Sequence, residues 1–84
     1  MKIYDYCGKA NLCGQQVQKM REKRKLSQAQ LSSVLQVMDV NIAQKAISRI
    51  ENGERVVADY ELLALAKALG VSPMWLLKEQ SEEN

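Results

Sequence analysis

Twelve residues in the middle of the chain, 42–53, combine apolar and polar side chains with the 3.6-residue period of an α-helix. One side of that helix would be apolar and contain Ala43, Ala46, Ile47 and Ile50. The opposite side would contain Gln44, Lys45, Ser48, Arg49 and Asn52. Gly53 follows at the point where the chain must turn away, and glycine tolerates the positive φ that such a turn needs. The stretch therefore predicts a short helix with one buried side and one exposed, hydrogen-bonding side.

The polar side of this predicted helix has the chemistry of a surface that contacts DNA. Amide and guanidinium groups can form paired hydrogen bonds with base edges, whereas hydroxyl groups and cations suit phosphates. We interpret residues 42–53 as a helix that packs on one side and contacts double-stranded DNA on the other.

The remainder of the chain also favours helices. Its 84 residues include one Pro, four Gly and no Phe, and they contain no long alternating run of β-branched residues. The length suits one domain and is short for a second, ligand-sensing domain. We expect an all-α fold of about five short helices around one core.

Local signals locate the first two helices. The first is expected to run from Asn11, its N-cap, to Lys25. Its inward residues would be Leu12, Val17, Met20 and Arg24. Ser27 and Gln30 have capping-box spacing, so the second helix should begin at Gln28. Its inward residues would be Leu31, Val34, Leu35 and Met38.

The segment from Asp39 to Asn41 reads as a turn, because Asp and Asn tolerate left-handed backbone geometry. Asn41 would also cap the third helix, while Val40 and Ile42 fill the joint.

Two more helices are expected in the second half. Asp59 is a candidate N-cap for a helix that ends at Gly70, and Ser72 with Pro73 would open a short last helix. The longer helix would bury Leu62, Leu65, Ala66 and Leu69, with Leu63 at the margin. The last helix contains Met74, Trp75, Leu76 and Leu77.

The charge is uneven along the chain although the net charge is only +2. Residues 1–25 contain seven Lys and Arg against two acidic residues, whereas residues 59–84 contain two against five. A basic first half suits a polyanionic partner. We divide the chain into an N-terminal arm (1–10), a DNA-binding domain (11–78) and a flexible acidic tail (79–84).

Several functional classes lack their sequence signals. There is no His to complete a zinc set, no nucleophile elbow and no Gly-rich phosphate loop, so we expect no metal, no cofactor and no enzyme activity. Cys7 and Cys13 are interpreted as ordinary thiols, with a redox pair as the alternative. No stretch approaches the roughly 20 apolar residues of a membrane span, and no secretory signal is visible. A cytoplasmic protein is expected.

Three motifs occur in a family-specific order: LSQxxL at residues 26–31, ISRIENG at 47–53 and LAKALGVS at 65–72. With them, the segment from about Leu12 to Leu77 resembles the phage-repressor-like, or XRE-type, helix-turn-helix DNA-binding domains. The resemblance implies a compact five-helix repressor-like domain whose second and third helices form the helix-turn-helix. The third helix would lie in the major groove.

The resemblance also implies roles for individual residues. Gln44 and Lys45 would meet base edges, with Arg49 one turn further along, while Gln28 and Ser27 would contact the backbone or a base edge. Arg55 would contact a phosphate, and Arg21 and Glu51 would form a structural ion pair. The complete set of DNA-facing candidates is Ser27, Gln28, Asn41, Gln44, Lys45, Ser48, Arg49, Asn52 and Arg55.

The sequence departs from the family at the joint before the third helix. The common turn reads Gly-Val-Ser, with Val about five residues before the Ile of that helix. Here Val37 stands ten residues before Ile47, and neither that Gly nor that Ser is present. A longer joint is expected, which leaves Asn41 and Gln44 as alternatives for the leading contact.

We therefore expect a sequence-specific transcriptional regulator, a repressor that binds a palindromic operator as a homodimer. Candidate dimer residues are Met74 and Trp75, with core filling as the alternative for Trp75. The arm residues Ile3, Tyr4 and Tyr6 offer a second candidate surface. An antitoxin or anti-regulator module with a protein partner is the alternative function, because fold alone does not exclude it.

Overall fold

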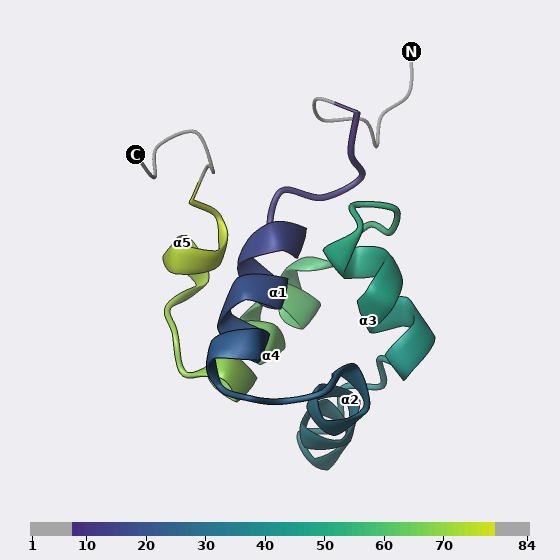
Figure 1. The fold of residues 1–84 in the computed structure, drawn as a ribbon, viewed down its shortest axis with the longest axis vertical. Helices are drawn as coiled ribbons and strands as arrows, with labels where there is room; N and C mark the ends of the chain where they lie inside the picture. The colour runs from purple at the N-terminus through teal and green to yellow at the C-terminus, as the bar shows by residue number, and fades with distance from the viewer. Residues whose placement is uncertain (1–7, 79–84) are drawn as a thin grey trace.

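The computed structural model describes residues 8–78, and Figure 1 shows their arrangement. In chain order the helices are α1 (Gly14–Lys23), α2 (Gln28–Val37), α3 (Gln44–Glu51), α4 (Asp59–Leu69) and α5 (Pro73–Leu76). The all-α, five-helix prediction is confirmed.

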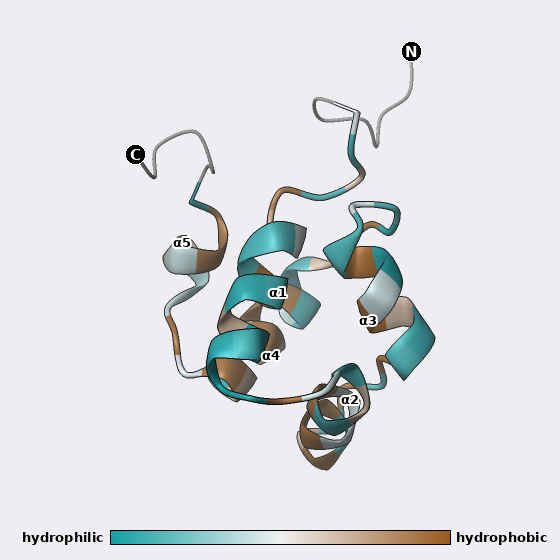
Figure 2. Ribbon diagram, in the orientation of Figure 1, coloured by the Kyte–Doolittle hydropathy of each residue, from teal (hydrophilic) through white to brown (hydrophobic). Residues whose placement is uncertain are grey.

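Helix α1 occupies the centre of the fold. It packs against α3, α4 and α5, while α2 packs against α3 and α4 (Figure 1). Figure 2 shows hydrophobic and hydrophilic residues following one another along α3, as expected for a helix with one buried side. The shared core consists of Cys13, Val17, Met20, Leu31, Leu35, Ile42, Ile47, Ile50, Ala64, Leu65, Ala66, Leu69 and Leu76.

Three predicted helix ends are confirmed. Ser27 Oγ accepts a hydrogen bond from Gln30 N at 3.0 Å, and the Gln30 side chain accepts one from Ser27 N at 2.8 Å. Gly70 ends α4 with a φ of 73°. Ser72 Oγ accepts a hydrogen bond from Trp75 N at 3.1 Å at the start of α5.

Helix α1 is shorter than predicted at both ends. It begins at Gly14, where Asn11 Oδ1 accepts the Gly14 N–H at 2.8 Å, so Asn11 caps the helix from three residues away. It ends at Lys23, because Lys25 adopts a left-handed φ of 61° that cannot continue a helix. The N-cap of α4 is likewise Ala58, and Asp59 is the first helical residue.

The joint between α2 and α3 spans residues 38–43, and one prediction about it is wrong. The N-cap of α3 is Ala43, so Asn41 does not cap this helix. Ile42, which lies five residues before Ile47, is buried in the joint as predicted, whereas Val37 lies on the surface. The exposed fractions are 2% for Ile42 and 85% for Val37. The joint is long, as predicted, and Asp39 adopts a left-handed φ of 63°.

Some residues predicted to face inward are exposed: Leu12, Arg24, Val34 and Ala43, with Leu63 exposed beyond the margin. Arg24 instead donates a hydrogen bond from Nε to Leu69 O at 3.0 Å, which satisfies a carbonyl at the end of α4. Gln16, which was not predicted to be inside, is fully buried and donates from Nε2 to Trp75 O at 3.0 Å.

Hydrogen bonds join the segment before α1 to the end of α3 and to the segment after it. Ala10 N donates to Gly53 O at 2.8 Å, and Asn11 Nδ2 donates to Ile50 O at 3.0 Å and to Arg55 O at 2.8 Å. Residues 8–10 of the predicted arm therefore lie beside the segment after α3. The rest of the arm, with Ile3, Tyr4, Tyr6 and Cys7, and the predicted acidic tail 79–84 lie outside the described residues.

Candidate nucleic-acid interface

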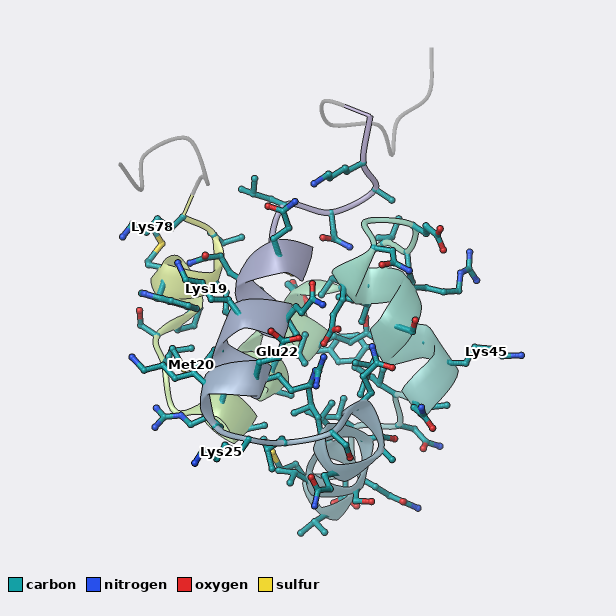
Figure 3. All side chains as sticks on the ribbon, in the orientation of Figure 1. Lys19, Met20, Glu22, Lys25, Lys45 and Lys78 are labelled. Carbon is teal, nitrogen blue, oxygen red and sulfur yellow. The ribbon has the colours of Figure 1, made fainter. Side chains whose placement is uncertain are left out.

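Helix α3 has one buried and one uncovered side. Ile47 and Ile50 are completely buried in the core. On the other side, Gln44, Lys45, Arg49 and Asn52 are exposed and Ser48 is half-buried. Figure 3 shows Lys45 extending away from the body of the molecule. The described part of the protein thus leaves this hydrogen-bonding side open to a ligand.

The turn before α3 contains one more exposed residue that was predicted to contact DNA. Asn41 is exposed and lies two residues before the N-cap Ala43. It is therefore on the surface next to the start of α3, as is Gln44 in the first turn.

Arg49 keeps most of its side chain in solvent. Its Nε lies 3.9 Å from Glu54 Oε1, and both side chains are more than half exposed. A long, exposed ion pair of this kind contributes little, so it does not hold Arg49 away from a polyanion.

A buried ion pair fixes α3 against α1. Arg21 Nε donates to Glu51 Oε2 at 2.6 Å and Arg21 Nη2 donates to Glu51 Oε1 at 3.1 Å. The hydrogen bonds to Glu51 raise the pKa of Arg21 above its ordinary value. Arg21 Nη1 also donates to Leu26 O at 2.7 Å, just before the start of α2.

Gln28 belongs to the same network, which the sequence did not reveal. Its Nε2 donates to Glu51 Oε1 at 3.0 Å, and its side chain is half-buried at the first position of α2. Ser27, next to it, is exposed and uses its Oγ to cap α2. The network therefore connects α1, the start of α2 and the end of α3.

Arg55 has an internal partner that sequence reasoning missed. Its Nη1 and Nη2 donate to the two oxygens of Glu61 at 3.0 and 3.1 Å. Glu61 Oε1 also accepts the Ala58 N–H at 3.0 Å, which helps to start α4. These hydrogen bonds raise the pKa of Arg55 and lower that of Glu61. The spacing of six residues across a loop and a helix start gave no signal of this pair.

The two predicted dimer residues differ in exposure. Met74 is 73% exposed, whereas Trp75 is half-buried and packs against the core. Trp75 thus contributes to the core, and Met74 is the more accessible of the two.

Cys13 lies in the core, and its burial raises the pKa of the thiol to about 11. It is therefore protonated and unreactive near neutral pH. No group of three or more potential metal ligands occurs within residues 8–78. None of the helices in this part of the chain is long and apolar enough to span a membrane.

Residues 17–76 match the family model HTH_3, described as Helix-turn-helix. The chain belongs to the XRE-type helix-turn-helix family. The solved structures that this helix-turn-helix chain resembles include the following two. The first is the P22 c2 repressor protein in complex with synthetic operator 9T in the presence of Tl+. It has a TM-score of 0.68 and 38% identity, and the match covers 81% of this chain and 96% of that one.

The second is the restriction-modification controller protein C.AhdI from Aeromonas hydrophila. It has a TM-score of 0.65 and 28% identity, and the match covers 75% of this helix-turn-helix chain and 84% of that one. The comparison with curated proteins gave no match.

Proposed function

We propose that this protein is a sequence-specific transcriptional regulator that binds double-stranded DNA through α3, and that it acts as a repressor without catalysis. The observation that carries the proposal is the division of α3 into a buried apolar side and an open side of amide, guanidinium, ammonium and hydroxyl groups. Such groups match the donors and acceptors of the major groove and the phosphates beside it.

The similar proteins support this proposal. One of them is a repressor solved in complex with a synthetic operator, and another is a controller protein of a restriction-modification system. The match to the P22 c2 repressor spans nearly all of that chain, so the two share the part of the fold that contains α2 and α3.

In the proposed complex, α3 enters the major groove with its first turn leading. Gln44 and Lys45 would meet base edges, and Arg49 would read a base pair one turn along. The phosphate contacts would come from the start of α2, from the open side of α3 and from the segments at each end of α3. These residues are Ser27, Gln28, Asn41, Ser48, Asn52 and Arg55.

We further propose that two copies bind a palindromic operator. One domain of this size covers too few base pairs for useful specificity, and related folds solve this by binding two half-sites. Met74 offers exposed apolar surface for the contact between copies, with Trp75 beside it. Light scattering of Met74→Ala and Trp75→Ala tests this surface: self-association of both variants equal to that of the parent would contradict it.

Selection from a random pool of double-stranded DNA tests the proposed function. We expect enrichment of a two-fold symmetric sequence with half-sites about one helical turn apart. A pool that remains random after selection would contradict the proposal. Capture of a protein from cell extract that survives nuclease treatment, together with a random pool, would favour the antitoxin or anti-regulator alternative.

A further inference from the structure

We propose that Glu51 is a positioning residue for Gln28: it holds the Gln28 amide in one orientation at the start of α2, so that the amide meets a DNA phosphate already aligned. This inference rests on the proposed function, because it assigns a ligand atom to part of the DNA-binding surface. It also gives the Arg21–Glu51 pair a role beyond joining two helices.

The Glu51 carboxylate is surrounded by donors from two other helices. Its side chain is 2% exposed, and it accepts two hydrogen bonds from Arg21 of α1. Its third hydrogen bond comes from Gln28 Nε2 of α2, at 3.0 Å. Arg21 also donates a hydrogen bond to Leu26 O, which fixes the position of the guanidinium group. The Glu51 carboxylate is therefore held in place by Arg21 independently of Gln28.

The chemistry of the two groups fixes which way the Gln28 amide faces. An ionised carboxylate only accepts hydrogen bonds, so the amide must present its nitrogen to Glu51 and not its oxygen. One N–H is used by that bond. Within residues 8–78 the second N–H and the carbonyl oxygen have no hydrogen-bond partner, and Gln28 is only half-buried, so solvent or a ligand can reach the side chain.

This arrangement suits a phosphate. A phosphate oxygen accepts hydrogen bonds, and the free amide N–H lies at the start of α2, where the helix dipole also favours an anion. Because Gln28 is ordered by an internal hydrogen bond, its rotamer freedom is lost on folding and not on binding. The expected ligand is therefore a backbone phosphate of duplex DNA. The Arg21–Glu51 pair sets the orientation in which the Gln28 amide meets it.

A double-mutant comparison on the selected duplex tests the coupling. In the parent, Gln28→Ala should lower affinity about tenfold, as expected for a hydrogen bond to a charged group. In the background Arg21→Met/Glu51→Leu, which removes the carboxylate without leaving a buried charge, the same change should cost less than about twofold. Because the Arg21–Glu51 pair also holds α3 in place, Arg49→Ala is the matched control: in this background the Gln28→Ala penalty should fall relative to the Arg49→Ala penalty. An equal fall of both penalties would overturn the inference.

Equal penalties for Gln28→Ala in the two backgrounds would overturn the inference. So would a parent in which Gln28→Ala leaves affinity unchanged while Arg49→Ala lowers it, and that outcome would leave the proposed function standing. A parent that binds no duplex would overturn the proposed function and the phosphate contact with it.

A measurement on the free parent protein covers the case in which the background variant does not fold. Side-chain NMR relaxation should find the Gln28 Nε2 group nearly as rigid as the backbone, with Gln44, whose side chain is exposed, as the mobile control. A Gln28 amide as mobile as that of Gln44 would overturn the inference without any reference to DNA.

Discussion

Arg21 and Glu51 face each other in the interior where α1 meets α3, with Arg21 Nε 2.6 Å from Glu51 Oε2. The two side chains are 10% and 2% exposed. Because Glu51 is the last residue of α3, this pair fixes the helix relative to the body of the domain. The orientation of the proposed DNA-contacting side therefore depends on a contact on the opposite side of the helix.

Removing one partner of this pair should unfold the domain more readily than removing both. Arg21→Met alone leaves a buried carboxylate without its cation and should lower the free energy of unfolding by about 3–5 kcal/mol. Arg21→Met/Glu51→Leu should recover most of that loss, because no unpaired charge remains. Urea unfolding followed by circular dichroism measures both. A double variant as unstable as the single one would contradict this explanation.

Gly14 is required by the close approach of α1 to α3. A Cβ at this position would collide with the backbone oxygen of Ile50, which already accepts from Asn11. Gly14→Ala should therefore destabilise the protein by about 1–3 kcal/mol through overpacking, although Ala is the better helix former. Gln15→Ala, at an exposed neighbouring position, is the control and should be neutral or stabilising. If the Gly14→Ala and Gln15→Ala variants had the same thermal unfolding midpoint, the predicted clash with Ile50 would be wrong.

Acid should weaken the protein through Glu61. Its pKa lies below the ordinary value of 4.5, chiefly because Arg55 donates hydrogen bonds to its carboxylate. A carboxyl with a depressed folded-state pKa stabilises the protein fully above its unfolded pKa, and that contribution is lost as the pH falls through the folded pKa. Glu61→Gln should thus flatten the pH dependence of stability below about pH 4.5. Glu54→Gln, at an exposed site, serves as the comparison, and identical acid profiles for parent and Glu61→Gln would refute the assignment.

Arg49→Ala should weaken binding to the selected duplex by about 1–3 kcal/mol and relax the preference at one base pair. Lys78→Ala is a charge-matched control on α5's side of the molecule, away from Lys45 (Figure 3), and should change binding far less. Fluorescence anisotropy on the selected duplex and on single-base variants measures both quantities. Undiminished affinity of the Arg49 variant would mean that α3 lies in another register.

The sequence predicted those helix ends that depend on local side-chain chemistry. The Ser27–Gln30 capping box, Gly70 and the Ser72–Pro73 pair each act within a few residues, so they can be read without the rest of the fold. The start of α3 could not be read in this way, because Ala43 has no polar side chain to mark an N-cap. Asn41 has a side chain suited to an N-cap, but it lies two residues before the N-cap position.

Burial and pairing depended on contacts distant in sequence. Val34 has the spacing of an inward residue of α2 but is 36% exposed, whereas Gln16 is buried because the Trp75 carbonyl accepts its amide. The side chain of Gln28 was predicted as a DNA contact, yet its hydrogen bond to Glu51, 23 residues away, follows only from the packing of α2 on α3. The exposed polar side of α3 was predictable because it follows from helical periodicity alone.

In the proposed complex, the open side of α3 is the surface that meets DNA. The most direct test is titration of the ¹⁵N-labelled protein with the selected duplex, with backbone and side-chain NMR shifts recorded for each residue. We expect the largest changes at Gln44, Lys45 and Arg49 and at Gln28 at the start of α2. Changes confined to α5 and the exposed side of α4, with α3 unaffected, would contradict it.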